Sequence, residues 1–286
     1  RYLPGSGTPP TLITEAEGLA GNHVVSIYRD DKGTIWVGST VMGVTRIDNG
    51  LAQTVDLGRS FTATCFVQDR DGRIWVGTEG QGIVVWDNGK EVHRFTEKEG
   101  LLSNTIKAWG HDRQGHVWIG TNKGLNKWRP KKGGFVAFTE RAGFTGIEVK
   151  PNAVCTTKSG NLWFGTATGA SLFIENPLPA NTPIFTNYTT LNGLPNDRIT
   201  SIAEDKSNNI WFTSTNGVFR LDRDWRFLPG HKAGFLSYML TKEVPNTSVT
   251  SILEDSKKNL WFGTLGAGVF RLNQNEKTYT VYTTAQ

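Results

Sequence analysis

The chain has 286 residues, of which 31 are basic and 26 acidic, so its net charge is +5. Hydrophobic residues make up 37% of the chain and 33 residues are glycine, which excludes a disordered polymer and favours a β-rich protein with many tight turns. The basic side chains are dispersed, which argues against a nucleic-acid partner, and no apolar stretch is long enough to insert this segment into a membrane.

The N-terminal segment precedes any repeated pattern. The chain starts at Arg1, without a methionine or a signal peptide, so we expect a processed mature protein or an excised domain. Its first predicted element is a strand over Pro10–Glu15.

A short unit then recurs six times, first as Gly33-Thr34-Ile35-Trp36-Val37-Gly38-Ser39. The units are centred on Trp36, Trp75, Trp118, Trp163, Trp211 and Trp261, which lie 39 to 50 residues apart. A repeat of that length, rich in β-branched and aromatic residues, is typical of a propeller blade. The sequence therefore predicts an all-β fold, a six-bladed β-propeller of four-stranded antiparallel blades, with residues 1–286 as a single domain.

The third repeat illustrates the elements expected in each blade. Strands are predicted over Thr105–Trp109, Val117–Thr121, Leu125–Trp128 and Phe135–Phe138. A hairpin turn at Asp112–Gly115 separates the first two. The second strand is a continuous apolar run, which indicates burial on both faces between neighbouring blades.

Two polar positions recur around each tryptophan. Six residues before it lie Asp30, Asp69, Asp112, Asp205 and Asp255, with Thr157 in the fourth repeat as the exception. Three residues after it lie Ser39, Thr78, Thr121, Thr166, Ser214 and Thr264. We interpret the Asp and the Ser/Thr of one repeat as a hydrogen-bonded pair that braces adjacent strands, because buried polar groups need partners.

The C-terminal segment Thr278–Thr283 reads as an outermost strand with no repeat after it. Because an open array would leave a sheet edge exposed, we expect pairing of the N- and C-terminal strands to close the ring. The sequence does not decide which of the two completes the shared blade. Cys65 and Cys155 fall in non-adjacent blades, so no disulfide is expected between them.

The repeats resemble a known family. The fifth copy contains Gly193-Leu194-Pro195-Asn196-Asp197, then Asp205, Trp211 and Asn216-Gly217-Val218, and is similar to the two-component-regulator propeller repeat. The first and third copies also match well at the start, whereas the second and fourth are degraded there. The resemblance implies the exported, periplasmic or secreted, sensor region of a bacterial signalling protein, with a saccharide-like ligand. Because the chain has six repeats and no kinase region, it is expected to be either a sensor domain of a larger protein or a free-standing relative.

Propeller loops predict where that ligand binds. The loops before the first strand and those between the second and third strands line one mouth of the central channel. The candidate ligand-binding residues there are Asn22, His23, Glu79, Gln81, Asn104, Lys107, Lys123, Asn152, Asn196, Asp197, Asn216 and Asn246. Amide and polar groups suit sugar hydroxyls, which need paired donors and acceptors. The alternative is that each Asn only shapes the turn before a strand.

Enzymatic activity is the less favoured interpretation. The sequence contains no zinc-binding histidine pair, nucleophile elbow or phosphate-binding loop, so no catalytic residues, metal or cofactor are assigned. Streptogramin lyases have similar propeller repeats, and a lyase or hydrolase at the same mouth would have to use His23 and Glu79. A third alternative is an interaction scaffold for another protein, recognisable by a large exposed apolar patch.

Overall fold

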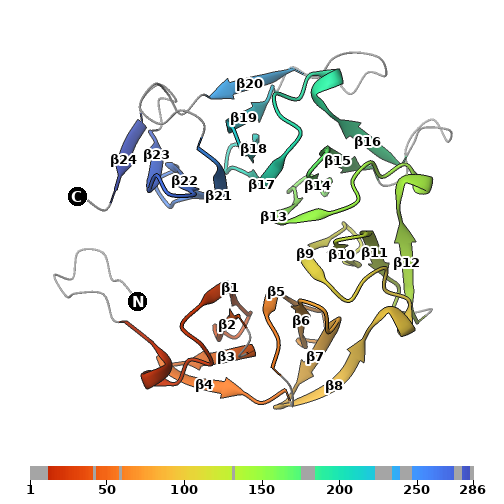
Figure 1. The fold of residues 1–286 in the computed structure, drawn as a ribbon, viewed down its shortest axis with the longest axis vertical. Helices are drawn as coiled ribbons and strands as arrows, with labels where there is room; N and C mark the ends of the chain where they lie inside the picture. The colour runs from red at the N-terminus through yellow and green to blue at the C-terminus, as the bar shows by residue number, and fades with distance from the viewer. Residues whose placement is uncertain are drawn as a thin grey trace. The chain divides into compact units, whose positions relative to one another are not determined.

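The computed structural model describes residues 12–40, 43–57, 60–130, 133–174, 184–222, 234–238, 247–273 and 279–283. They form six four-stranded antiparallel sheets, each with its strands in sequence order (Figure 1). The chain divides into two compact units, residues 1–99 with 103–106, and residues 100–102 with 107–286.

The first unit contains two sheets. Its elements are η1 (Glu15–Glu17), β1 (Val24–Arg29), β2 (Ile35–Ser39), β3 (Gly43–Asp48), β4 (Leu51–Val55), β5 (Ala63–Gln68), β6 (Ile74–Thr78), β7 (Ile83–Asp87), β8 (Lys90–Phe95) and η2 (Glu97–Glu99). The η elements are single turns of 3-10 helix. β5 of the second sheet packs against β1 of the first.

The second unit contains the other four sheets. Its elements are β9 (Ile106–His111), β10 (Val117–Thr121), β11 (Gly124–Trp128), β12 (Phe135–Phe138), η3 (Glu140–Ala142), β13 (Val149–Thr156), β14 (Leu162–Thr166), β15 (Gly169–Phe173), β16 (Phe185–Tyr188), η4 (Thr190–Asn192), β17 (Ile199–Glu204), β18 (Ile210–Ser214), β19 (Gly217–Leu221), β20 (Phe235–Tyr238), β21 (Val249–Glu254), β22 (Leu260–Thr264), β23 (Val269–Leu272) and β24 (Tyr279–Tyr282). β13 packs against β17, and β17 packs against β21.

The predicted fold class is confirmed, since every sheet has the expected strand order and antiparallel pairing. In the third repeat the predicted strands agree with β9 to β12 to within two residues. The second strands β6, β10 and β14 are buried at every residue, as their apolar sequences indicate. The core therefore lies between successive sheets rather than on one side of them.

In the third and fourth repeats the glycine two residues after the tryptophan lies where the next sheet comes closest. A Cβ atom on Gly165 would lie only 2.5 Å from Cγ2 of Ile199. Gly120 meets Val149 at 2.7 Å in the same way. Because Ile199 and Val149 are completely buried, any side chain at these glycines would push the two sheets apart.

The predicted pairing of Asp with Ser/Thr is wrong. The Asp carboxylate instead accepts the indole N–H of the tryptophan, at 3.0 Å for Asp30, 2.9 Å for Asp69, 3.1 Å for Asp112, 2.8 Å for Asp205 and 2.9 Å for Asp255. The hydroxyl group donates at the far end of the second strand, as in Thr121 to the Gly124 carbonyl at 2.9 Å. The length of the second strand separates the two side chains, so they cannot meet.

The C-terminal strand lies where the sequence predicts it. β24 is the outermost strand of the last sheet, as predicted for Thr278–Thr283. The predicted N-terminal strand Pro10–Glu15 is wrong over its described part, because residues 12–14 form no strand and Glu15 begins η1, whereas Pro10 and Thr11 lie outside the described residues. Closure by pairing of the terminal strands stays a prediction. Cys65 and Cys155 are free cysteines, as expected from their separate sheets.

Candidate functional site

Two loops meet at one end of each sheet. We call the loop before the first strand the leading loop, and the loop between the second and third strands the return loop. The backbone N–H of Thr40 donates to the His23 carbonyl at 2.9 Å, and Glu79 donates to Thr62 at 3.0 Å. In the second unit Thr215 donates to Arg198 at 3.3 Å. The leading and return loops of these repeats therefore lie side by side.

The leading loops of the first, third, fourth and fifth sheets begin with the 3-10 turns η1 to η4, which were not predicted from the sequence. In η1 the Thr14 hydroxyl accepts the Ala16 N–H, and the Glu17 carboxylate accepts the Thr14 N–H at 2.7 Å. The same arrangement recurs at η2, where Glu99 accepts the Thr96 N–H at 2.7 Å. The signal was available, because Thr followed three residues later by Glu is the capping-box pattern.

Three of the predicted ligand-binding residues fasten these turns. The side-chain oxygen of Asn22 accepts the Glu15 N–H at 2.9 Å. Asn104 accepts the Glu97 N–H at 2.8 Å. Asp197 accepts both the N–H and the hydroxyl of Thr190, at 2.6 and 2.9 Å. Each acceptor is seven residues after its donor, so these side chains hold the leading loop against itself.

The other predicted residues differ in exposure. His23, Glu79, Lys123 and Asn216 are exposed, whereas Gln81, Lys107 and Asn196 are half-buried. Asn152 lies in β13, although its side chain is not described, and Asn246 lies outside the described residues.

Backbone contacts group some of these residues within each unit. In the first unit the return loop at Glu79 and Gln81 lies against the next leading loop, since the N–H groups of Gly80 and Gly82 donate to the Asn104 carbonyl at 3.1 and 2.8 Å. In the second unit Asn216 neighbours Asn196 through the contact between Thr215 and Arg198.

The parts of the chain that the structure describes contain no cluster of metal ligands, since no three His, Cys, Asp or Glu side chains are arranged there to hold a metal ion. Asp69–Gly72, whose sequence begins like a calcium loop, is a hairpin in which Asp69 accepts the N–H groups of Asp71 and Arg73. Of the described helices, none could span a bilayer.

Comparison with protein families identifies the repeat. The model of the two component regulator propeller matches residues 18–40, 58–80, 100–123, 193–216 and 243–266. The chain carries two-component regulator propeller repeats. The matched segments omit the start and second strand of the fourth repeat, where Thr157 replaces the aspartate.

Solved structures show the same fold. The extracellular domain of BT3049 from B. thetaiotaomicron, described as part of a hybrid two-component system, matches with a TM-score of 0.75 and 24% identity over 90% of this chain and 34% of that one. PorZ of Porphyromonas gingivalis, a surface component of the type-IX secretion system, matches with a TM-score of 0.73 and 18% identity, over 97% of this chain and 43% of that one.

An enzyme is also among the similar structures. Virginiamycin B lyase from Staphylococcus aureus matches with a TM-score of 0.68 and 15% identity, over 91% of this chain and 84% of that one. No curated protein matches the sequence significantly. This chain spans about a third of the extracellular domain of BT3049 and less than half of the PorZ chain.

Proposed function

We propose that the chain is the ligand-binding region of an exported bacterial sensor protein, located in the periplasm or outside the cell. Its ligand is a saccharide-like polar molecule bound by the leading and return loops. The regulator propeller repeats support the sensor role, as does the similarity to the extracellular domain of BT3049.

The observation that carries the proposal is the meeting of leading and return loops at one end of each sheet. The capped 3-10 turns hold the leading loops in place, so little conformational entropy is lost when a ligand binds. In the first unit, exposed His23 and Glu79 present imidazole and carboxylate groups on these loops, and in the second unit exposed Lys123 and Asn216 present ammonium and amide groups. Such a mixture offers the donors and acceptors that hydroxyl groups need.

A panel of mono- and oligosaccharides tests the proposal by thermal shift and calorimetry. At least one sugar should raise the melting temperature, and Asn216→Ala or Lys123→Ala should weaken its binding about tenfold, or 1.4 kcal/mol. Lys90→Ala is the control, because Lys90 is an exposed lysine of β8. The proposal fails if no sugar binds, or if Lys90→Ala weakens binding as much as Lys123→Ala does.

Lyase activity is the second candidate, favoured by the match over 84% of virginiamycin B lyase. His23 and Glu79 are its candidate acid–base residues, and both are exposed in the first unit. If the protein cleaves a streptogramin, His23→Ala and Glu79→Ala should each lower kcat/KM by about 100-fold or more. Undiminished activity in both variants would exclude this site.

A further inference from the structure

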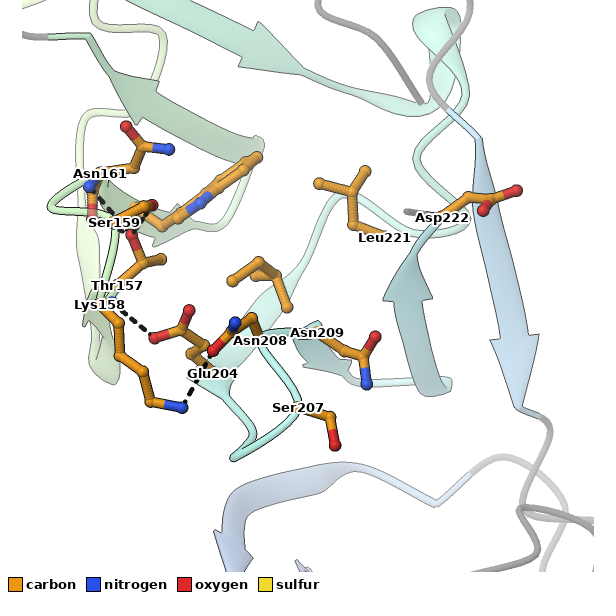
Figure 2. Close-up of a pocket in the computed structure, with 12 residues that line it drawn as sticks. Thr157, Lys158, Ser159, Asn161, Glu204, Ser207, Asn208, Asn209, Leu221 and Asp222 are labelled. Atoms are coloured by element: carbon orange, nitrogen blue, oxygen red, sulfur yellow. Dashed lines mark hydrogen bonds between the residues drawn. The ribbon is translucent and has the colours of Figure 1, made fainter. Parts of the chain in front are cut away.

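A pocket of about 680 Å³ lies in the second unit, at the hairpins that join the first and second strands of the fourth and fifth sheets (Figure 2). These hairpins lie at the opposite end of the first strands from the leading loops, because each first strand runs from its leading loop to its hairpin. Thr157 and Asn161 line it from the fourth sheet, and Glu204 and Asn208 from the fifth. Its volume is within the usual range of ligand pockets, roughly 300–1,000 Å³.

The pocket adjoins the one repeat that lacks the aspartate. Thr157 has a single side-chain oxygen, which accepts the Asn161 N–H at 2.9 Å and lies 2.8 Å from the Ser159 hydroxyl. Trp163 is only 1% exposed and lines the pocket. Throughout the described ranges, no acceptor is found for its indole N–H, whereas the other five repeat tryptophans donate theirs to Asp. Because Trp163 lines the pocket, an acceptor bound there would give this N–H a hydrogen-bond partner.

The corresponding hollow between the fifth and sixth sheets shows what the replacement changes. It measures about 220 Å³ and is lined by residues equivalent to those of the larger pocket, with Asp205 in place of Thr157 and Asn209 in place of Asn161. Asp205 accepts the Trp211 N–H at 2.8 Å, and Trp211 does not line the hollow. The pocket at Trp163 is thus larger than the hollow at Asp205. Its tryptophan N–H has no Asp acceptor, unlike the N–H of Trp211.

The charges around the pocket favour a neutral ligand. Two carboxylates, Glu204 and Asp222, line it. The ammonium group of Lys158 is engaged by the Asp205 carbonyl and the Asn208 side chain, both at 3.1 Å. An anion would be repelled by the carboxylates, and an ammonium group offers no acceptor for the Trp163 N–H.

The residues that line the pocket also indicate the chemical class of the ligand. Leu221 and Ile210 form an apolar wall, and Figure 2 shows Leu221 across the pocket from Ser159 and Asn161. A sugar ring has an apolar face of C–H groups and hydroxyls that both donate and accept. Such a molecule matches an apolar wall beside amide, hydroxyl and carboxylate groups.

We infer that this pocket is a second binding site, separate from the leading and return loops, for a neutral sugar of one or two rings. One oxygen of the sugar accepts the Trp163 indole N–H and so takes the role that Asp has in the other repeats. Asn161, Asn208 and Glu204 bind its other hydroxyls.

The indole N–H signals in a ¹⁵N–¹H NMR spectrum test the inference directly. The Trp163 signal is identified by its loss in Trp163→Phe. Glucose, galactose, mannose, maltose, cellobiose and lactose are then titrated, with glucuronate and glucosamine as charged counterparts. At least one neutral sugar should shift the Trp163 signal saturably, and its charged counterpart should bind at least tenfold more weakly. The inference is overturned if no neutral sugar shifts that signal, or if glucuronate binds as tightly.

Thr157→Asp is the decisive variant, because it supplies the carboxylate that the other repeats contain. It should keep or raise the melting temperature while abolishing the sugar-induced shift at Trp163, a combination that general damage to the fold would not produce. Retained binding in the folded variant would overturn the inference. Hydrogen exchange in the ligand-free wild type gives a check that needs no variant: the Trp163 indole N–H should exchange at least tenfold faster than that of Trp211. If the two indole N–H groups exchange at the same rate, the Trp163 N–H is not available to a ligand and the inference is overturned.

The two proposed sites can fail independently. Asn216→Ala and Lys123→Ala should leave the sugar-induced shift at Trp163 unchanged, because they alter the leading and return loops only. A sugar whose binding is weakened by Asn216→Ala but does not shift Trp163 would support the proposed function and overturn the second site.

Discussion

Each recurring residue of the short unit has a definite partner in the structure. The aspartate accepts the indole N–H of the tryptophan and backbone N–H groups of its own hairpin, as Asp205 does for Ser207 and Asn209. The glycine leaves room for the next sheet. These residues therefore build the blades, and the one replacement among the aspartates, Thr157, is the more informative about binding.

Gly165→Ala should destabilise the protein by about 1–3 kcal/mol, because its Cβ would lie 2.5 Å from Ile199 and 2.8 Å from Ala153. Urea denaturation measures the change in the free energy of unfolding. Ile199→Ala removes the nearest clashing atom, Cγ2, so it should cost less in the Gly165→Ala background than in the wild type. If the changes in the free energy of unfolding of the two substitutions simply add, the contact with Ile199 is not the cause of the destabilisation.

Asp255 makes stability depend on pH. Hydrogen bonds from the Trp261 indole and the Asn259 amide lower the pKa of this carboxyl group to about 2. An unfolded Asp titrates near about 3.9, so the unfolded chain binds more protons between these values. The stabilisation is therefore complete above about pH 4 and is lost as the pH falls towards 2.

We expect Asp255→Asn to be less stable than the wild type at pH 6, and the difference to shrink as the pH falls below 4. Denaturation curves at several pH values measure it. Asp31→Asn, a change at an exposed hairpin aspartate, serves as the control for the loss of a negative charge. A difference that is the same at pH 6 and pH 2.5 would contradict the assignment.

At the scale of the elements, capped 3-10 turns begin the leading loops of the first, third and fifth sheets. Asn104→Ala removes the acceptor for the Glu97 N–H and should cost about 0.5–2 kcal/mol. Asn216→Ala, at an exposed return-loop amide, should leave the stability of the ligand-free protein unchanged. Chemical denaturation of both variants distinguishes a structural asparagine from one available to a ligand. Equal effects would remove that distinction.

At the scale of the whole molecule, the exposure of Val24 provides a test of ring closure. Val24 is 41% exposed, while its counterparts Ala63, Val149 and Ile199 are completely buried by the preceding sheet. If the predicted ring closes, Val24 should be covered as well.

Thiol labelling of Val24→Cys, with Cys65 and Cys155 replaced by Ser, measures this coverage. Slow labelling is expected, comparable with Ala63→Cys. Leu51→Cys, at a residue that is 73% exposed, provides the fast reference. Labelling of Val24→Cys at the rate of Leu51→Cys would argue against closure.

The number of repeats, their strands and their buried second strands were predictable from the sequence, because these properties depend on local periodicity and turn residues. The capped turns were missed although Thr14 and Glu17 carry the signal. The roles of Asn22, Asn104 and Asp197 in fastening those turns depend on how each leading loop folds back on itself. Their residue types alone suit a turn and a ligand equally well.

The absence of Asp at position 157 is visible in the printed sequence, but its consequence is not. That the aspartate serves the tryptophan appears only when the hairpin and second strand are placed together, since the two side chains converge across the turn. That Thr157 leaves a pocket beside Trp163 depends further on the neighbouring sheet, which contributes Glu204, Asn208 and Leu221. Local pattern therefore determined the blades, whereas the packing of one sheet against the next decided which of their polar groups are left to bind a ligand.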